Sequence, residues 1–232
     1  MLEITNVHAS YSKTPILRGI DVSVETGEIV GIMGKNGVGK TTLVKTVMGL
    51  LEADEGRIVF DGEDVTDEPA DVRARHGMGY IPQGRDVFPE LTVEENLRMG
   101  ETINDGTDDL QYDAVYDYFP ILEERRDQEA GTMSGGQQQL LAIGRALIGN
   151  PELLVLDEPS EGVQPSIVQD ITRDLRRVNE ELGTTILFVE QNLHVVQRLG
   201  ERCYAIDKGA IVDELGPERL ESRDAVTEYL AV

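Results

Sequence analysis

Three apolar runs constrain the fold of this chain more than any other feature. They are residues 28–34 (EIVGIMG), 152–158 (ELLVLDE) and 184–191 (TTILFVEQ). Each run is apolar on both faces and becomes polar only at its C-terminal end, which is typical of parallel strands covered by helices on both sides. Ligands bind just beyond the carboxyl ends of such strands. We therefore expect an α/β fold with its functional groups at Gly34 and beyond, at Asp157 and Glu158, and at Glu190 and Gln191.

The residues before and after these runs predict further strands. Leu2, Ile4 and Val7, and then Ile20, Val22 and Val24, alternate with polar residues, which predicts half-buried antiparallel strands near the N-terminus. Residues 57–65 predict another strand that ends in an Asp-Gly turn. Residues 204–216 predict a terminal hairpin that turns at residues 207–209.

Residues 84–150 have a helical rather than a strand pattern. Thr92 and Glu95 have the spacing of a capping box, the polar residues 101–109 predict a loop, and residues 111–119 predict more helix. Further on, an apolar face from Ile167 to Leu182 predicts an amphipathic helix that stops at Gly183. We expect one domain over residues 1–232, in which 1–83 and 151–232 form the core with its β-subdomain and 84–150 form a helical subdomain.

The composition excludes several classes of protein. The net charge of −23 argues against nucleic acid as a partner, because phosphate neutralisation needs a basic face. The sequence has no run of eighteen apolar residues, and its first ten residues lack the features of a secretion signal, so we expect a cytoplasmic protein. Cys203 is the only cysteine and the three histidines are scattered, which disfavours a zinc site.

A phosphate-binding loop follows the first apolar run. Residues 34–42 (GKNGVGKTT) match the pattern G-x-x-x-x-G-K-T, between a predicted strand and a predicted helix. Its backbone N–H groups would surround the β- and γ-phosphates of a nucleotide, Lys40 would add a positive charge, and the Thr41 hydroxyl would bind Mg²⁺. The residues predicted to bind ATP here are Gly34, Lys35, Asn36, Gly37, Val38, Gly39, Lys40, Thr41 and Thr42.

Polar residues at the ends of two other predicted strands complete this site. Asp157 would bind Mg²⁺ through water, and Glu158 would polarise the water that attacks the γ-phosphate. Gln83 follows a predicted strand, from which its amide oxygen could bind Mg²⁺ and sense the nucleotide. In isolation, Gln83 would be read as an ordinary surface glutamine.

Residues 132–140 (TMSGGQQQL) look like a second helix N-terminus that is prepared for an anion. Together with the phosphate loop, Gln83 and the run LLVLDEP, this segment resembles the ATP-binding cassette ATPases over essentially the whole chain. The resemblance implies that Ser134, Gly135, Gly136 and Gln137 form the signature motif, which contacts an ATP molecule bound to a facing subunit. It also implies that Tyr11 stacks on adenine, although a core tyrosine is an alternative interpretation.

Two positions depart from the common pattern of that family. Gln191 stands where most members have a histidine after the last core strand, and Gln164 replaces the aspartate that commonly crosses to the partner subunit. We expect Gln191 to donate a hydrogen bond to a γ-phosphate oxygen. The segment VEQN is similar to cassettes of branched-chain amino acid importers, whereas DEPSEGVQPSIV and PQGRDVFPELTVEENL look closer to cassettes of urea or short-chain amide importers.

The resemblance predicts an ATPase subunit that uses ATP and Mg²⁺ to drive import of a small polar solute. The expected solute is urea or a short-chain amide, with branched-chain amino acids as the alternative. Implied partners are a second cassette, which is either a copy of this chain or a different one, permease subunits docked near residues 83–93, and indirectly a solute-binding protein. The chain would then lie on the inner face of the cell membrane.

Two other classes of protein are alternatives to an importer ATPase. One is a soluble cassette ATPase of DNA repair or translation, which the absence of a long insertion or a second cassette disfavours. The other is a phosphate-loop kinase or GTPase, which would leave residues 134–138 (SGGQQ) unexplained.

Overall fold

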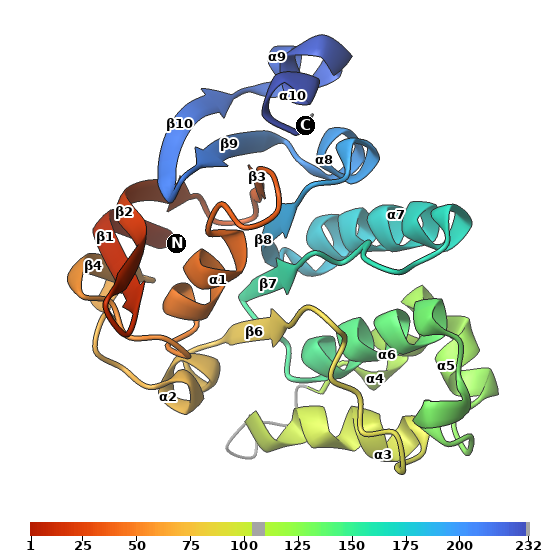
Figure 1. Cartoon of the computed structure of the whole chain (residues 1–232). Helices are drawn as coiled ribbons and strands as arrows, with labels where there is room; N and C mark the ends of the chain where they lie inside the picture. Colours follow the sequence, from red (N-terminus) through yellow and green to blue (C-terminus); the bar gives the residue numbers. More distant parts are fainter. Residues whose placement is uncertain (104–109, 231–232) are drawn as a thin grey trace.

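The structure is a computed structural model that describes residues 1–103 and 110–230. Its N-terminal sheet is antiparallel and has the strand order β2-β1-β4-β5 (Figure 1). These strands are β1 (Leu2–Tyr11), β2 (Thr14–Val24), β4 (Glu55–Phe60) and β5 (Glu63–Asp64). The pairs Leu2 with Val24 and Ile4 with Val22 confirm the register in which the alternating apolar residues share one face.

The second sheet contains the three apolar runs and has the strand order β10-β9-β3-β8-β7-β6. All its neighbouring strands are parallel except β10, which runs antiparallel to β9. The strands are β3 (Ile29–Met33), β6 (Met78–Ile81), β7 (Leu153–Asp157), β8 (Thr185–Glu190), β9 (Arg202–Asp207) and β10 (Ala210–Leu215). Every residue of β3, β7 and β8 is buried, as expected for strands covered on both faces.

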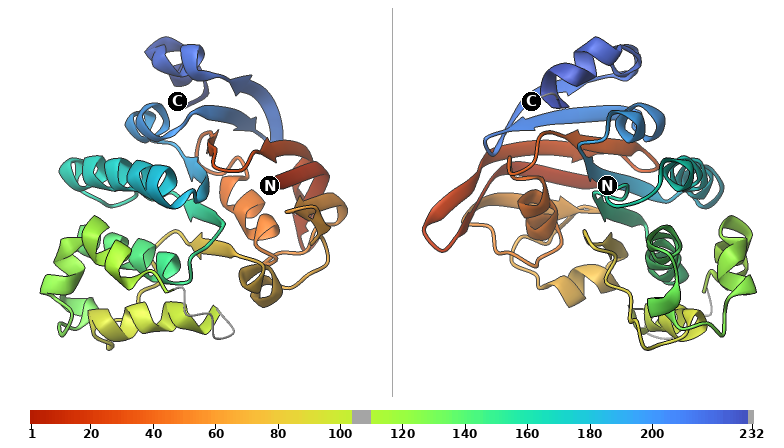
Figure 2. Two further views of the ribbon diagram at one scale, coloured as in Figure 1. Left: turned by 180° about the vertical axis from the view of Figure 1, so that it is seen from behind. Right: turned by 45° about the vertical axis from the view of Figure 1, so that its right-hand side comes forward.

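Helices cover both faces of this second sheet. One helix, α1, packs between the two sheets, and its Leu43, Val44 and Val47 share a core with Val30, Ile32 and Val155. The opposite face packs against α6, α7 and α8 (Figure 2). The helices outside residues 84–150 are α1 (Lys40–Val47), α2 (Ala70–Arg75), α7 (Pro165–Leu182), α8 (Leu193–Leu199), α9 (Pro217–Glu221) and α10 (Arg223–Leu230).

The described residues between β6 and β7 form a group of helices beside the sheets (Figures 1 and 2). They are α3 (Val93–Arg98), η1 (Met99–Ile103), α4 (Tyr112–Tyr118), α5 (Pro120–Glu124), η2 (Ala130–Thr132) and α6 (Gly135–Ile148), where η marks a 3₁₀ helix. The capping box of Thr92 and Glu95 is formed as predicted. Residues 101–103 belong to η1 rather than to the predicted loop, and residues 104–109 of that prediction lie outside the described residues.

The fold class is confirmed, and the differences lie in short elements. The amphipathic helix ends at Gly183 in a left-handed conformation, with φ of 73°, as the sequence predicts. Helices α2, α9 and α10 were not predicted, because each is short and buries few apolar side chains. The predicted terminal hairpin forms, but β9 also pairs with β3 and thereby joins the central sheet. The division into subdomains stays a prediction.

Candidate active site

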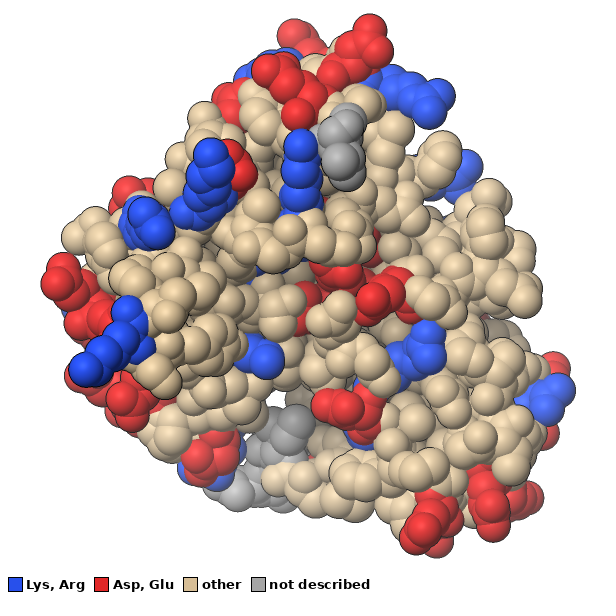
Figure 3. Space-filling model, viewed as in Figure 1, with Lys and Arg blue, Asp and Glu red and all other residues tan. Residues whose placement is uncertain are grey.

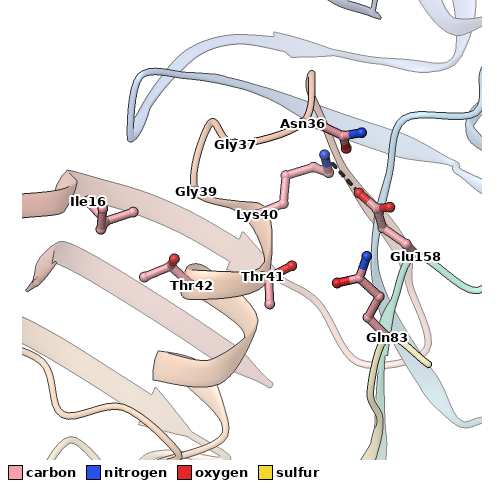
Figure 4. Close-up of a pocket in the computed structure, with 9 residues that line it drawn as sticks. All are labelled: Ile16, Asn36, Gly37, Gly39, Lys40, Thr41, Thr42, Gln83 and Glu158. Carbon is pink, nitrogen blue, oxygen red and sulfur yellow. Dashed lines mark ion pairs between the residues drawn. The ribbon is translucent and has the colours of Figure 1, made fainter. Parts of the chain in front are cut away.

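A cavity of about 340 Å³ lies where β3 leads into α1 (Figure 4). It is at the carboxyl end of the parallel strands, where ligands of such sheets bind. Its lining residues are Ile16, Asn36, Gly37, Gly39, Lys40, Thr41, Thr42, Gln83 and Glu158. Most of them come from the predicted phosphate loop. Ile16 was missed by the sequence reasoning, because an apolar residue in an alternating strand gives no signal of a binding site.

The phosphate loop has the backbone that an anion cradle needs. Gly37 and Gly39 have φ of 79° and 115°, a region that glycine enters without strain. Helix α1 begins at Lys40 with no side-chain cap and no acidic residue in its first turn. Its first N–H groups are therefore left for a ligand, and the helix dipole favours an anion there.

The turn between β9 and β10 is hydrogen-bonded to the phosphate loop and to β2. The Gly209 N–H donates to the Val38 carbonyl at 2.9 Å, and the Arg18 N–H donates to the Gly209 carbonyl at 2.8 Å. A Cβ atom on Gly209 would lie 1.7 Å from the Ile16 carbonyl oxygen, so no other residue fits this turn without movement. These two bonds connect the N-terminal part of the chain to its C-terminal part, and no spacing in the sequence indicates them.

Lys40 and Glu158 meet inside the cavity. The Lys40 ammonium donates to the carbonyls of Gly34 and Lys35, at 2.9 Å each, and forms an ion pair with Glu158 at 3.0 Å (Figure 4). The other Glu158 oxygen accepts a hydrogen bond from the Gln191 amide at 3.3 Å. Both charged side chains are buried. The geometry thus brings the predicted phosphate cation, the predicted water-polarising carboxylate and Gln191 together.

Thr41 and Asp157 form a second polar contact at the same edge of the sheet. The Thr41 hydroxyl donates to Asp157 Oδ1 at 3.1 Å, whereas Oδ2 is buried with no hydrogen-bond partner among the described residues. Burial raises the pKa of Asp157 to about 6; the hydrogen bond from Thr41 opposes this rise and the neighbouring Glu158 adds to it. An unpaired carboxylate oxygen beside a hydroxyl fits the oxygen ligands that Mg²⁺ prefers.

A magnesium ion would draw most of its ligands from nucleotide and water rather than from this chain. The described residues contain no group of three His, Cys, Asp or Glu that could hold a metal by itself. Sites for Mg²⁺ bound with a nucleotide commonly use one or two protein oxygens plus phosphates. Thr41, Asp157 and Gln83 therefore fit the predicted role.

Gln83 reaches the cavity but is bonded to another residue. Its amide nitrogen donates to the Glu161 carboxylate at 2.8 Å, and Figure 4 shows its side chain beside Glu158. Glu161 belongs to the loop after β7, 78 positions along the chain. The surface interpretation of Gln83 is thus incomplete, because this exposed side chain has a definite partner next to the site.

Glu190 is a residue whose role the sequence did not reveal. Its buried carboxylate accepts three backbone N–H groups: that of Ser160 at 3.0 Å, and those of Gln191 and Asn192 at 2.9 Å each. It ties the loop after β7 to the loop after β8, and so fixes the backbone from which Gln191 approaches Glu158. Its only signal in the sequence was a polar residue at the end of an apolar run. That signal does not tell whether the side chain binds a ligand or holds the surrounding loops in place.

The predicted signature residues and Tyr11 lie outside the cavity lining. Ser134 Oγ accepts from the Gln137 N–H, and the Gln137 side chain accepts from the Ser134 N–H, so α6 starts with a capping box. Tyr11 is 45% exposed at the end of β1. Val38 packs against the apolar core, Lys35 is exposed, and Gln164 is the N-terminal cap position of α7. The roles of all these residues stay predictions.

The whole chain was compared with known proteins. The family described as ABC transporter matches residues 17–161. A high-affinity branched-chain amino acid transport ATP-binding protein, BraG of Pseudomonas aeruginosa, is 45% identical over 213 residues, which are 91% of each chain. The lipopolysaccharide export system ATP-binding protein LptB of Haemophilus influenzae is 36% identical over 233 residues, 97% of this chain and 95% of the relative.

Solved structures give the same result. The ADP conformation of an ATP-binding cassette of an ABC transporter superimposes with a TM-score of 0.85 at 30% identity, over 100% of this chain and 99% of that one. A dimeric ATP-binding cassette in a post-hydrolysis state, bound to ADP and Pi, superimposes with a TM-score of 0.83 at 26% identity, over 94% and 99% of the two chains.

This chain belongs to the ABC transporter family and is an ATPase of that type. The resemblance and the fold class inferred from the sequence are confirmed. The relatives' names support branched-chain amino acids, the alternative, and do not support urea, which was the main expectation for the solute. No helix among residues 1–103 and 110–230 is both long and apolar enough to cross a membrane.

Proposed function

We propose that this chain is the ATPase subunit of an importer for branched-chain amino acids. One observation carries the enzymatic part: Lys40, Thr41, Asp157, Glu158 and Gln191 meet at one edge of the parallel sheet. The relatives that carry branched-chain amino acid transport in their names support the choice of solute.

The residues of the cavity suit in-line attack of water on the γ-phosphate of ATP. Glu158 accepts a proton from the attacking water while the bond to the departing ADP oxygen breaks. Lys40, released from Glu158 by the incoming phosphates, offsets the negative charge that moves onto the leaving oxygens. Bound Mg²⁺, held by Thr41, Gln83 and, through water, Asp157, would neutralise phosphate charge. Gln191 donates its amide N–H to Glu158 or to a γ-phosphate oxygen.

The signature motif is proposed to complete the site of a second cassette. The capping box uses the Ser134 hydroxyl oxygen as an acceptor and leaves its proton free to donate to a phosphate oxygen. The chain would pair head to tail with another cassette, so that each phosphate loop faces a signature helix. The dimeric state of a solved cassette bound to ADP and Pi supports this pairing.

A second cavity, of about 260 Å³, is the proposed docking site for a permease subunit. Its lining includes Phe88 and Met99, which are 43% and 41% exposed, together with Tyr80 and Arg145. Among the described residues, the buried Tyr80 Oη and Arg145 Nη1 have no hydrogen-bond partner. A protein segment with an apolar anchor and a carboxylate would cover the apolar side chains and satisfy both donors. The chain would then lie on the cytoplasmic face of the membrane.

Hydrolysis is tested with Glu158→Gln and the control Glu152→Gln, an exposed acid next to the start of the same strand. We expect the first variant to bind ATP and to lose hydrolysis by about 100-fold or more, and the second to keep wild-type activity. Light scattering of Glu158→Gln with ATP and Mg²⁺ then measures pairing. A doubled mass supports self-pairing, whereas a monomer that binds ATP points to a different partner cassette. Full hydrolysis by Glu158→Gln would refute the role of this residue.

The solute is tested in vesicles that contain the complete transporter with this chain. We expect ATP-driven uptake of labelled leucine and none of urea. A second candidate, export of a lipid-linked glycan, rests on the relatives named LptB. Movement of lipopolysaccharide out of the membrane without leucine uptake would favour that candidate over the importer.

A further inference from the structure

We propose that Arg85 is a positioning residue that fastens the signature end of α6 to the loop after β7. The Arg85 Nη2 group donates to the carbonyl oxygens of Glu161 at 3.1 Å and Gly162 at 3.2 Å. These two carbonyls follow Glu158 in the chain, so Arg85 is attached to the loop that carries the water-polarising carboxylate. This inference rests on the proposed function, since it concerns how the signature motif meets a partner's ATP.

The same guanidinium lies against the first residue of α6. A Cβ atom on Gly135 would be 3.1 Å from Arg85 Nη1 and 3.2 Å from Nη2. A Cβ atom on Gly162 would likewise be 3.2 Å from Nη2. These distances are shorter than ordinary van der Waals contacts, so a side chain at either position would displace the guanidinium. Arg85 therefore contacts three segments that are far apart in the sequence: its own loop, the start of α6 and the loop after β7.

The backbone around Arg85 is bent to reach this place. Gly84, Arg85 and Asp86 have φ of 90°, 76° and 45°, three successive residues in the left-handed region. For residues other than glycine this conformation is strained, and it persists only where surrounding contacts fix it. Gln83, directly before this turn, is bonded to the same loop through Glu161. Together with the two bonds from Arg85, this bond attaches the segment 83–85 to residues 161–162.

The positive charge of Arg85 indicates that its role is not to stabilise helix α6. A cation at a helix N-terminus is opposed by the helix dipole, so Arg85 does not stabilise α6 electrostatically. Among the described residues no carboxylate forms an ion pair with Arg85, and its buried Nε has no hydrogen-bond partner. Its position is explained by its bonds to the loop after β7 and its packing against the start of α6, which together set where Ser134 lies relative to that loop.

Loss of Arg85 would loosen the start of α6 relative to the loop after β7, while the rest of the helix stays packed in the core. ATP binding to the phosphate loop would be unchanged, because Arg85 does not line that cavity. Pairing of two cassettes would weaken, since the signature motif would have to be ordered when the partner binds. Hydrogen bonds made by a charged donor contribute about 1.5–3 kcal/mol, which corresponds to a weakening of about tenfold or more.

The experiment compares Arg85→Ala, Arg85→Lys and the control Arg98→Ala, in which an exposed arginine on α3 loses an ion pair with Glu94. Steady-state hydrolysis is measured over a range of ATP and of protein concentrations. For Arg85→Ala we expect an unchanged KM for ATP and a protein concentration for half-maximal specific activity that rises at least about tenfold. Arg85→Lys should recover part of this, because an ammonium can still donate to the carbonyls but has no planar group to lie against Gly135. The control should behave as wild type.

Amide hydrogen exchange of residues 134–138 in the monomer gives a second measurement. We expect faster exchange in Arg85→Ala, with the midpoint of thermal unfolding close to that of the control. Unchanged exchange and unchanged concentration dependence would overturn the proposal, as would a parallel loss of ATP binding, activity and thermal stability. If wild-type activity does not depend on protein concentration, the chain does not pair with a copy of itself under these conditions, and hydrogen exchange still decides the role of Arg85.

Discussion

The starts of α1 and α6 are two glycine-containing helix N-termini that differ in how their N–H groups are capped. Helix α1 begins without any side-chain cap, and a buried lysine lies beside its loop. Helix α6 begins with a complete capping box made by Ser134 and Gln137. The first is left incomplete in the absence of a ligand, whereas the second is already satisfied by its own chain.

This difference explains why one chain carries two such features. An uncapped N-terminus with a cation nearby can bind a polyanion by itself. A capped N-terminus offers a hydroxyl proton and a few N–H groups, which can contact a phosphate that is already held elsewhere. The comparison therefore predicts that damage at α1 abolishes binding, whereas damage at α6 abolishes turnover.

The largest effect is expected from Lys40→Ala. Removal of the ammonium leaves the phosphates without their cation and leaves the buried Glu158 without its partner at 3.0 Å. We expect ATP affinity, measured by titration calorimetry, to fall by about 100-fold or more. Lys45→Ala, on the same helix, is the matched control and should bind ATP normally. Near-normal binding by Lys40→Ala would remove the contrast between the two helix starts.

Ser134→Arg tests the other side of the comparison. An arginine at this cap position would block the approach of a second cassette, so turnover should fall by about 100-fold while ATP binding stays within about twofold. Thr92→Arg destroys the similar capping box of α3 and controls for the loss of a cap, which costs about 1 kcal/mol. Equal loss of ATP binding in Lys40→Ala and Ser134→Arg would refute the proposal that the signature serves a facing subunit.

Glu190→Gln tests the catalytic residues without changing either helix start. It weakens the bonds between the loop after β7 and the loop after β8. The new NH₂ group cannot accept an N–H, so one of the bonds to Ser160, Gln191 or Asn192 is lost. We expect kcat to fall about tenfold with little change in the KM for ATP, because Gln191 moves relative to Glu158. Asp174→Asn, at another buried carboxylate, should leave kcat unchanged. A rise in KM with unchanged kcat would contradict a positioning role.

The smallest effect concerns stability and pH. Because burial raises the pKa of Asp157 to about 6, the folded state binds its proton more tightly than the unfolded state does. The resulting stabilisation is complete near pH 4 and is lost as the pH rises to about 6. An asparagine at position 157 does not ionise, so the Asp157→Asn variant does not lose this stabilisation as the pH rises. Its free energy of unfolding should therefore exceed that of wild type by roughly 1–3 kcal/mol above pH 7.

Urea denaturation of both proteins between pH 4 and pH 8, without nucleotide, measures this difference. We expect the gap between them to open from pH 4 to about pH 6 and then to stay level. With ATP and Mg²⁺ the wild type should gain more stability than the variant, because the metal favours the ionised carboxylate. A constant gap at all pH values would show that Asp157 does not titrate in this range.

The charge of the chain has a visible counterpart on its surface. Figure 3 shows acidic side chains at the top, the left edge and the lower right of one face. Further acidic side chains lie near the centre of this face, so they are not confined to its edges. The cavity itself contains both signs of charge, with Lys40 next to Glu158.

The parts of the site that could be read from the sequence are those encoded in short stretches. The phosphate loop, the capping box at Thr92, and the stop at Gly183 each depend on residues within ten positions of one another, and so does the helix start at residues 132–140, although its capping box was not predicted. The composition of the three apolar runs also predicts that they are buried and that their C-terminal ends carry polar groups. Urea was preferred over branched-chain amino acids on resemblance alone, because no residue of an ATPase subunit needs to contact the solute.

The sequence by itself determined the strands, the phosphate loop and the helix starts, because backbone geometry and apolar periodicity act over a few residues. Only the tertiary structure decided which of these segments touch. Glu190 bonds a residue 30 positions away, Arg85 bonds carbonyls 76 and 77 positions away, and Gly209 bonds Val38 across most of the chain. Such contacts follow from the crossing of chain segments in a parallel sheet, and no local spacing specifies them.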